Sequence, residues 1–166
     1  MTSSGSTVLF GAIPAHLKLS AVEKRVLGQF ANVLGRRVGD SRTFVCLLAD
    51  DAHLRRLNLS FLNNDYPTDV LSFPSVGATN ELGEIAISIE RAAAQAAEFG
   101  HPCLDEIRIL MLHGVLHLTG LDHQTGDGQM AREEERWRAE FSLPETLIAR
   151  AHRPASRVSK LKKGAA

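Results

Sequence analysis

The stretch Leu110-Met-Leu-His-Gly-Val-Leu-His-Leu-Thr-Gly-Leu-Asp-His123 decides the fold, because the rest of the chain has to bury it. Apolar residues surround this segment on nearly all sides, a pattern typical of a buried central helix. His113 and His117 are four residues apart, so on a helix both rings lie on one face and can reach one metal ion. Gly120 can end the helix in the left-handed conformation, which lets His123 turn back toward the pair.

These histidines predict a metal centre. A single histidine on an apolar helix is usually a hydrogen-bonded core residue, but two buried imidazoles without partners would be costly. Three imidazoles suit zinc and leave a fourth coordination position open for water. We therefore predict that His113, His117 and His123 bind one Zn²⁺ ion.

Two motifs in the chain resemble those of a known family. His-Gly-x-Leu-His-Leu-x-Gly-x-Asp-His, from His113 to His123, resembles the signature of the YbeY family of bacterial rRNA-maturation endoribonucleases. Pro67-Thr-Asp-Val-Leu-Ser-Phe-Pro74 resembles the second signature of that family, and the resemblance covers about residues 45–141. It implies a zinc-dependent, single-strand-specific endoribonuclease in rRNA processing and ribosome maturation, with the three histidines acting through the metal. The implied partners are single-stranded RNA, in particular ribosomal RNA, and ribosome or small-subunit assembly proteins.

Two other functions compete with this interpretation. The spacing His-x3-His-x5-His is also that of the metzincin zinc proteases, but Gly114 stands where those proteases carry the glutamate that deprotonates water. A glycine inside a helix is less stable than alanine by about 1 kcal/mol, which suggests that substrate or a neighbouring strand approaches closely there. The second competitor is a ribosome-assembly factor whose zinc is structural.

Residues around the motif supply further candidates. Asp122 could orient His123 or act on the attacking water as a catalytic residue, or simply cap nearby amides. Many family members carry an arginine, a suitable phosphate ligand, where this chain has Leu62. Either Arg55, Arg56 or the C-terminal tail supplies that charge for RNA binding, or the protein binds RNA more weakly or differently. Four polar residues in or near the second motif could line the same cleft: Asp65, Thr68, Asp69 and Ser72. The other four histidines have no partner at metal-binding spacing and are predicted at the surface: His16, His53, His101 and His152.

Length and charge indicate one domain with a basic tail. The chain has 166 residues, 44% of them hydrophobic, which is enough for one hydrophobic core without stabilising disulfide bonds. We assign this single domain to residues 1–152. Residues 153–166 hold five basic residues and no acid, so the remainder of this neutral chain carries a net charge of −5. This tail could bind RNA phosphates or be merely a disordered terminus.

Cysteine usage and the absence of targeting signals favour the cytoplasm. The two cysteines, Cys46 and Cys103, show neither the density of a disulfide framework nor metal-binding spacing, and we interpret them as reduced thiols. We recognise no secretory signal and no apolar run long enough to span a bilayer. The sequence therefore predicts a cytoplasmic protein without a membrane partner.

The periodicity of apolar residues predicts an α+β fold. We expect a single domain in which a small mixed β-sheet packs against about five helices, with the histidine helix buried at the centre. Residues 84–89 alternate as in a half-buried strand and could pair with 69–73 as a hairpin. The predicted strands are 7–10, 43–49, 69–73 and 84–89. The predicted helices are 19–34 (capped by Ser20 and stopped by Gly35), 51–59, 91–99 (ended by Gly100), the motif helix from residue 103 to the stop at Gly120, 129–141 and 145–151.

Overall fold

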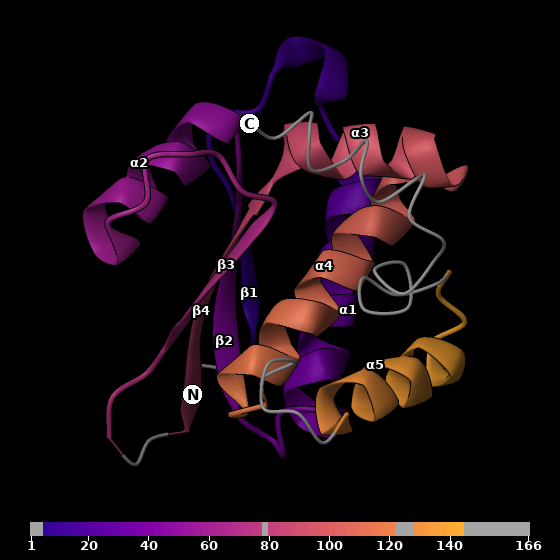
Figure 1. The fold of residues 1–166 in the computed structure, drawn as a ribbon. Coiled ribbons are helices and arrows are strands. Elements are labelled where there is room, and N and C mark those ends of the chain that lie inside the picture. The colour runs from indigo at the N-terminus through magenta and orange to yellow at the C-terminus, as the bar shows by residue number, and fades with distance from the viewer. Residues whose placement is uncertain (1–4, 78–79, 122–127, 145–166) are drawn as a thin grey trace.

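A mixed four-stranded sheet lies at the centre of the molecule (Figure 1). The structure, a computed structural model, describes residues 5–77, 80–121 and 128–144. The strand order is β1-β2-β4-β3, with β1, β2 and β4 parallel and β3 antiparallel to β4. This arrangement confirms the predicted edge strand and the hairpin. The strand predicted as buried lies inside the sheet, and its residues alternate between partly buried and buried up to Leu48. The strands are β1 (Thr7–Phe10), β2 (Thr43–Ala49), β3 (Val70–Pro74) and β4 (Glu81–Ser88).

The interior strand β4 differs from the prediction for residues 84–89. It begins at Glu81 and ends at Ser88, and only Glu81 and Glu84 are exposed, so the expectation of a half-buried strand was wrong. The reason is that β4 lies between β2 and β3 and has helices on both faces, which a period-two pattern does not reveal. Ile89, predicted in the strand, begins the next helix instead, because the Ser88 hydroxyl accepts from the backbone N–H of Arg91 and caps it.

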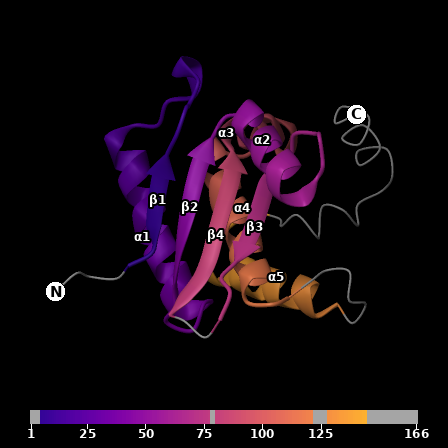
Figure 2. The same ribbon diagram turned by 90° about the vertical axis from the view of Figure 1, so that its left-hand side faces the viewer.

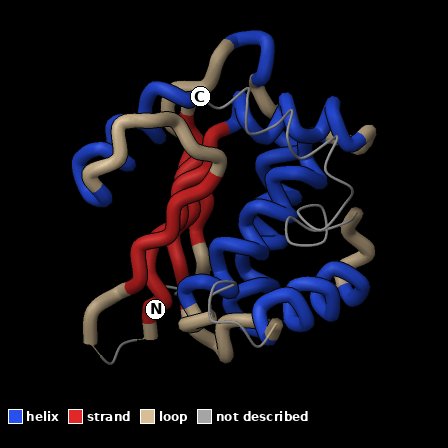
Figure 3. Tube along the Cα trace, in the orientation of Figure 1, coloured by secondary structure: helices blue, strands red, loops and turns tan. Residues whose placement is uncertain are grey.

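Helices cover the two faces of the sheet unequally (Figures 1 and 3). The helix α2 packs on one face, where Leu54 joins Ala49, Leu71 and Ala86 in a small apolar cluster. Figure 2, which looks onto the face of the sheet, shows α1 and α4 behind the strands and α2 in front. The helices of the described residues are α1 (Ala21–Arg37), α2 (Asp51–Leu62), α3 (Ile89–Phe99), α4 (Cys103–Leu118) and α5 (Gln129–Glu140), with a 3-10 turn at Ala15–Leu17.

The histidine helix α4 is the centre of the larger core, as predicted. It packs against β3 and β4 and is flanked by α1, α3 and α5. Nearly every side chain from Glu106 to Leu118 is buried. The fold is therefore a single α+β domain in which five helices of the described residues surround a mixed sheet.

Helix ends follow the predicted caps, with two exceptions. Ser20 and Glu23 form a capping box at the start of α1, and Gly100, at φ +72°, ends α3. Gly35, however, does not stop α1, which continues to Arg37. A Cβ at Gly35 would lie 2.6 Å from both the Arg42 carbonyl oxygen and the Ser6 hydroxyl, so this glycine allows close packing.

The second exception is α2, which runs one turn beyond the predicted end at residue 59 and stops at Leu62. Asn63 takes the left-handed conformation there and closes the helix. The predicted helix 145–151 and tail 153–166 lie outside the described residues. No helix in the described part of the chain is long and apolar enough to cross a membrane.

Candidate metal centre

The two helical histidines face one another as their spacing predicts. The Nε2 atoms of His113 and His117 are 3.1 Å apart, and their ring centroids are separated by 4.7 Å at an interplanar angle of 73°. Two nitrogens bound tetrahedrally to one zinc at about 2.0–2.1 Å would be roughly 3.3 Å apart. The pair therefore fits two neighbouring corners of a zinc site.

The third predicted ligand, His123, lies outside the described residues, as does Asp122. Gly120 has a φ of +98°, and its N–H donates to the carbonyl of His117, so the chain turns at the predicted position. Within the described residues, no group of three or more histidine, cysteine or acidic side chains could hold a metal ion. The third ligand and the bound zinc ion thus stay predictions.

Gly114 lies where the central helix meets the sheet. A Cβ at this position would be 3.0 Å from Cδ1 and from Cγ2 of Ile85, a side chain of β4 that is 1% exposed. The predicted close approach is therefore that of a neighbouring strand. The same turn of α4 is tied to β3, because the Ser72 hydroxyl donates to the Gly114 carbonyl at 3.2 Å. Ser72 thus contacts the motif helix at the residue after His113.

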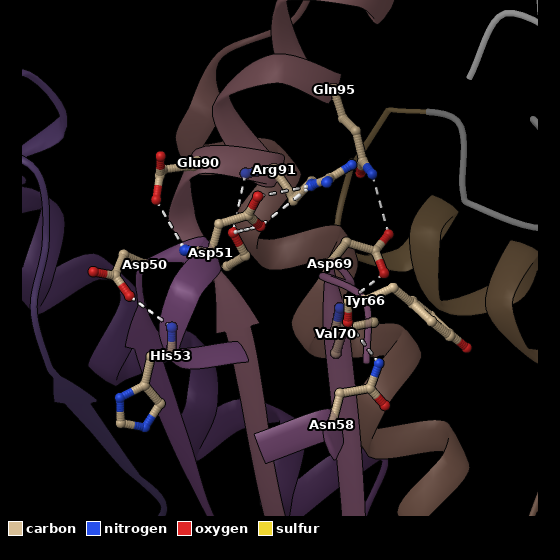
Figure 4. Close-up of polar contacts among 11 residues, drawn as sticks. Asp50, Asp51, His53, Asn58, Tyr66, Asp69, Val70, Glu90, Arg91 and Gln95 are labelled. Atoms are coloured by element: carbon tan, nitrogen blue, oxygen red, sulfur yellow. Dashed lines mark hydrogen bonds and ion pairs between the residues drawn. The ribbon is translucent and has the colours of Figure 1, made fainter. Parts of the chain in front are cut away.

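The second motif is anchored at its other end through Asp69 (Figure 4). One carboxylate oxygen of Asp69 accepts from the Val70 N–H at 2.8 Å, and the other accepts from the Gln95 side chain of α3 at 3.1 Å. Close by, Asp51 at the start of α2 accepts from Arg91 Nε at 3.2 Å. These contacts join β3, α2 and α3. They give Asp69 a structural role in holding the second motif against the helices.

The predicted RNA-binding arginines lie on α2, on the opposite face of the sheet from α4 (Figure 1). Arg55 pairs with Asp65 at 2.8 Å, and its hydrogen bond and positive charge lower the pKa of that carboxyl. Arg56 lies 3.4 Å from Nδ1 of His53. Leu62, at the position of the common family arginine, is 48% exposed at the end of the same helix. Both arginines and Leu62 therefore lie on α2, across the sheet from the histidine helix.

One of the remaining histidines does not lie at the surface. The side chain of His101 is only 8% exposed, and its Nε2 lies 3.3 Å from the buried Glu106 carboxylate. The expectation of a surface residue was wrong because His101 follows the end of α3 at Gly100 and is folded back beside the first turn of α4. Spacing along the sequence could not reveal this partner, which comes from the next helix.

Sequence reasoning missed a buried glutamate beside the centre. Oε2 of Glu134, on α5, lies 2.9 Å from Nδ1 of His113. A signal for it existed: Met130, Trp137 and Phe141 form the apolar stripe of α5, and position 134 falls on that stripe one turn after Met130. A charged residue at such a position needs a buried partner, and His113 provides one.

Comparisons with known proteins agree with the two motifs. Residues 16–142 match the family described as Endoribonuclease YbeY. A protein named Endoribonuclease YbeY from Solibacter usitatus is 53% identical over 88% of this chain and 95% of its own length, and one from Koribacter versatilis is 40% identical over the same shares. The solution structure of a Thermotoga maritima protein superposes with a TM-score of 0.51 at 25% identity, covering 81% of this chain and 91% of the other. The chain therefore belongs to the Endoribonuclease YbeY family.

Proposed function

We propose that this protein is a zinc-dependent endoribonuclease that cleaves single-stranded RNA in rRNA processing and ribosome maturation. Membership of the Endoribonuclease YbeY family makes it a nuclease, a hydrolase of phosphodiester bonds. The observation that carries the metal dependence is the pair of Nε2 atoms of His113 and His117, 3.1 Å apart at the end of a buried helix. His123 and the neighbouring Asp122 would complete the centre from the segment that follows Gly120.

Some residues of the proposed centre bind the metal, and others keep its surroundings in place. His113 and His117 would hold the metal from one helix face, and the Ser72 bond to Gly114 keeps β3 beside them. A bound zinc ion supplies a Lewis acid that lowers the pKa of water and stabilises charge on a phosphoryl oxygen. Phosphodiester hydrolysis is compatible with a helix that carries no acid or base at position 114.

Packing at Gly114 disfavours the competing protease function. The metzincin mechanism needs a glutamate side chain at this position, between the two helical histidines. Even a Cβ atom at Gly114 would lie only 3.0 Å from two carbons of the Ile85 side chain, so a longer side chain would be crowded there. We therefore place the zinc protease behind the nuclease and behind an assembly factor with a structural zinc.

Substrate geometry favours a single strand. A single strand can be splayed into a cleft beside a buried helix, whereas an RNA duplex holds its backbone at fixed A-form geometry. We further propose that the substrate is ribosomal RNA, that the protein works with ribosome or small-subunit assembly proteins, and that it acts in the cytoplasm. Sedimentation of the full chain with purified ribosomal subunits would test the association.

Cleavage by the zinc-loaded full chain tests the reaction. We expect end-labelled single-stranded RNA to be cut and the matched duplex to be spared. Activity should fall to background after chelation and in His117→Ala, whereas His16→Ala, an exposed histidine far along the chain, should retain it. Products with cyclic phosphate ends, together with inert single-stranded DNA, would identify attack by the RNA 2′-hydroxyl. Products without cyclic phosphate ends would favour attack by water.

The same experiment separates the alternatives. RNA cleavage that persists in His117→Ala, or after confirmed zinc removal, comes from a contaminating nuclease. The assembly factor with a structural zinc would then be the better explanation.

A further inference from the structure

The helix α5 carries three consecutive glutamates that have different surroundings. Oε2 of Glu133 accepts from the indole Nε1 of Trp137 at 3.2 Å, and Glu135 pairs with Arg138 near the surface. Glu134 is completely buried between Met130 and Trp137, which are 1% and 8% exposed. Only the middle carboxylate of the three is directed into the core, and it is directed at α4.

The contact between Glu134 and His113 bears on which nitrogen of the His113 ring carries the proton. Oε2 of Glu134 lies 2.9 Å from Nδ1 of His113, on the side of the ring opposite the 3.1 Å contact between the two Nε2 atoms. An ionised carboxylate can only accept a hydrogen bond, so this contact favours the tautomer that carries the ring proton on Nδ1. In this tautomer Nε2, which faces His117, is the ring nitrogen that can bind a metal.

Charge balance points in the same direction. A fully buried carboxylate such as that of Glu134 is stabilised by hydrogen bonds and by positive charge close to it. A divalent cation held by the two Nε2 atoms would supply that charge from the far side of the same ring. Carboxylates that accept from a metal-binding histidine commonly fix its tautomer and orientation in this way.

We propose that Glu134 is a positioning residue that locks His113 in the tautomer with the proton on Nδ1 and thereby prepares Nε2 for metal binding. The inference rests on the proposed metal centre and adds a residue that the two sequence motifs do not include. It predicts that Glu134 acts on zinc affinity through His113, without itself touching metal or RNA.

Zinc affinity of the full chain, measured by competition with a chromophoric chelator, tests this role. Glu134→Gln keeps the size of the side chain and removes its charge, and we expect zinc binding about 10–100-fold weaker than in the unchanged chain. Glu135→Gln removes a charge from the neighbouring position, whose carboxylate pairs with Arg138, and should leave the affinity unchanged. Thermal unfolding in excess chelator checks that both variants are folded.

The position of the ring proton on His113 is a second test, because a purely structural role of Glu134 would not change it. Long-range ¹H–¹⁵N correlation spectra of the metal-free unchanged chain should show the Nδ1–H tautomer for His113, and Glu134→Gln should weaken that preference. Equal zinc affinity in Glu134→Gln, equal weakening in Glu135→Gln, or an Nε2–H tautomer of His113 in the unchanged chain would each overturn the role of Glu134. If the unchanged chain binds no zinc, the metal centre itself fails and the inference fails with it.

Discussion

Replacement of Gly114 by alanine should destabilise the protein, although alanine is the better helix former. In an exposed helix the change would stabilise by about 1 kcal/mol. Here the new methyl group would lie 3.0 Å from two carbons of Ile85, against about 3.5–4.0 Å for an unstrained carbon contact. Overpacking of this kind destabilises by about 1–3 kcal/mol, so the net loss should be about 1 kcal/mol. In a domain of this size that loss lowers Tm by roughly 2–4 °C.

Two further variants show whether Ile85 is the cause. Gly28→Ala is a matched control, because Gly28 is inside α1 and a Cβ there would meet nothing within 4 Å. It should stabilise by about 0.5–1 kcal/mol. In an Ile85→Ala background the crowding carbons are gone, so Gly114→Ala should become stabilising. Urea unfolding of the metal-free full chain, followed by the fluorescence of Trp137, measures all of these differences.

The sign of the effect decides the test. Stabilisation by Gly114→Ala equal to that by Gly28→Ala would refute the close approach of β4. An effect of the same sign and size in both Ile85 backgrounds would show that the strain arises elsewhere. Gly114 would then need an explanation from substrate access.

Three other predictions follow from the centre, the core and the tail. His113→Ala and His117→Ala should each lose the zinc-dependent part of thermal stability, about 2.7 kcal/mol at a zinc concentration 100-fold above Kd, and calorimetry with and without chelator measures this loss. Burial raises the pKa of the Cys46 thiol to about 12, so the folded chain keeps a proton that the unfolded chain loses above pH 9. Unfolding should therefore become easier as pH rises from 9 to about 12, and a Cys46→Ala variant that shows the same fall in this window would contradict the assignment. Removal of residues 153–166 should leave the stability nearly unchanged. It should reduce the steepness with which the log of the single-stranded RNA binding constant falls with log salt concentration, by at most about 3–4. An unaltered slope would exclude the tail from RNA binding.

Much of the fold was predictable because the local signals for helix ends agree with the pattern of buried apolar residues. Ser20 with Glu23 begins α1 and Gly100 ends α3, and both signals act within one helical turn. The errors occur where tertiary contacts decide. Gly35 reads as a helix stop, yet the proximity of Arg42 makes it a packing position, and β4 is buried on both faces because of its place in the sheet.

The candidate site was predictable to the extent that it is local. His113 and His117 face one another because their spacing places them on one side of a helix. The partner on Nδ1 of His113 comes from Glu134, 21 residues later, and its contact depends on how α5 packs against α4. The same dependence on packing separates Arg55 from the histidines, because α2 crosses to the other face of the sheet.

The strand order affects how the chain folds. Thr7 pairs with Val45 and Val45 with Glu84, so each parallel pairing closes a loop of about 40 residues, whereas β3 and β4 form one antiparallel hairpin. Closing a long loop requires the larger entropy loss, so we expect the hairpin to form early and β1 to join last. Destabilising substitutions in the β3–β4 pairing should then mainly slow refolding, and those in β1 should mainly accelerate unfolding. The two strands that contact the histidine helix, β3 and β4, would thus be in place before the sheet is complete.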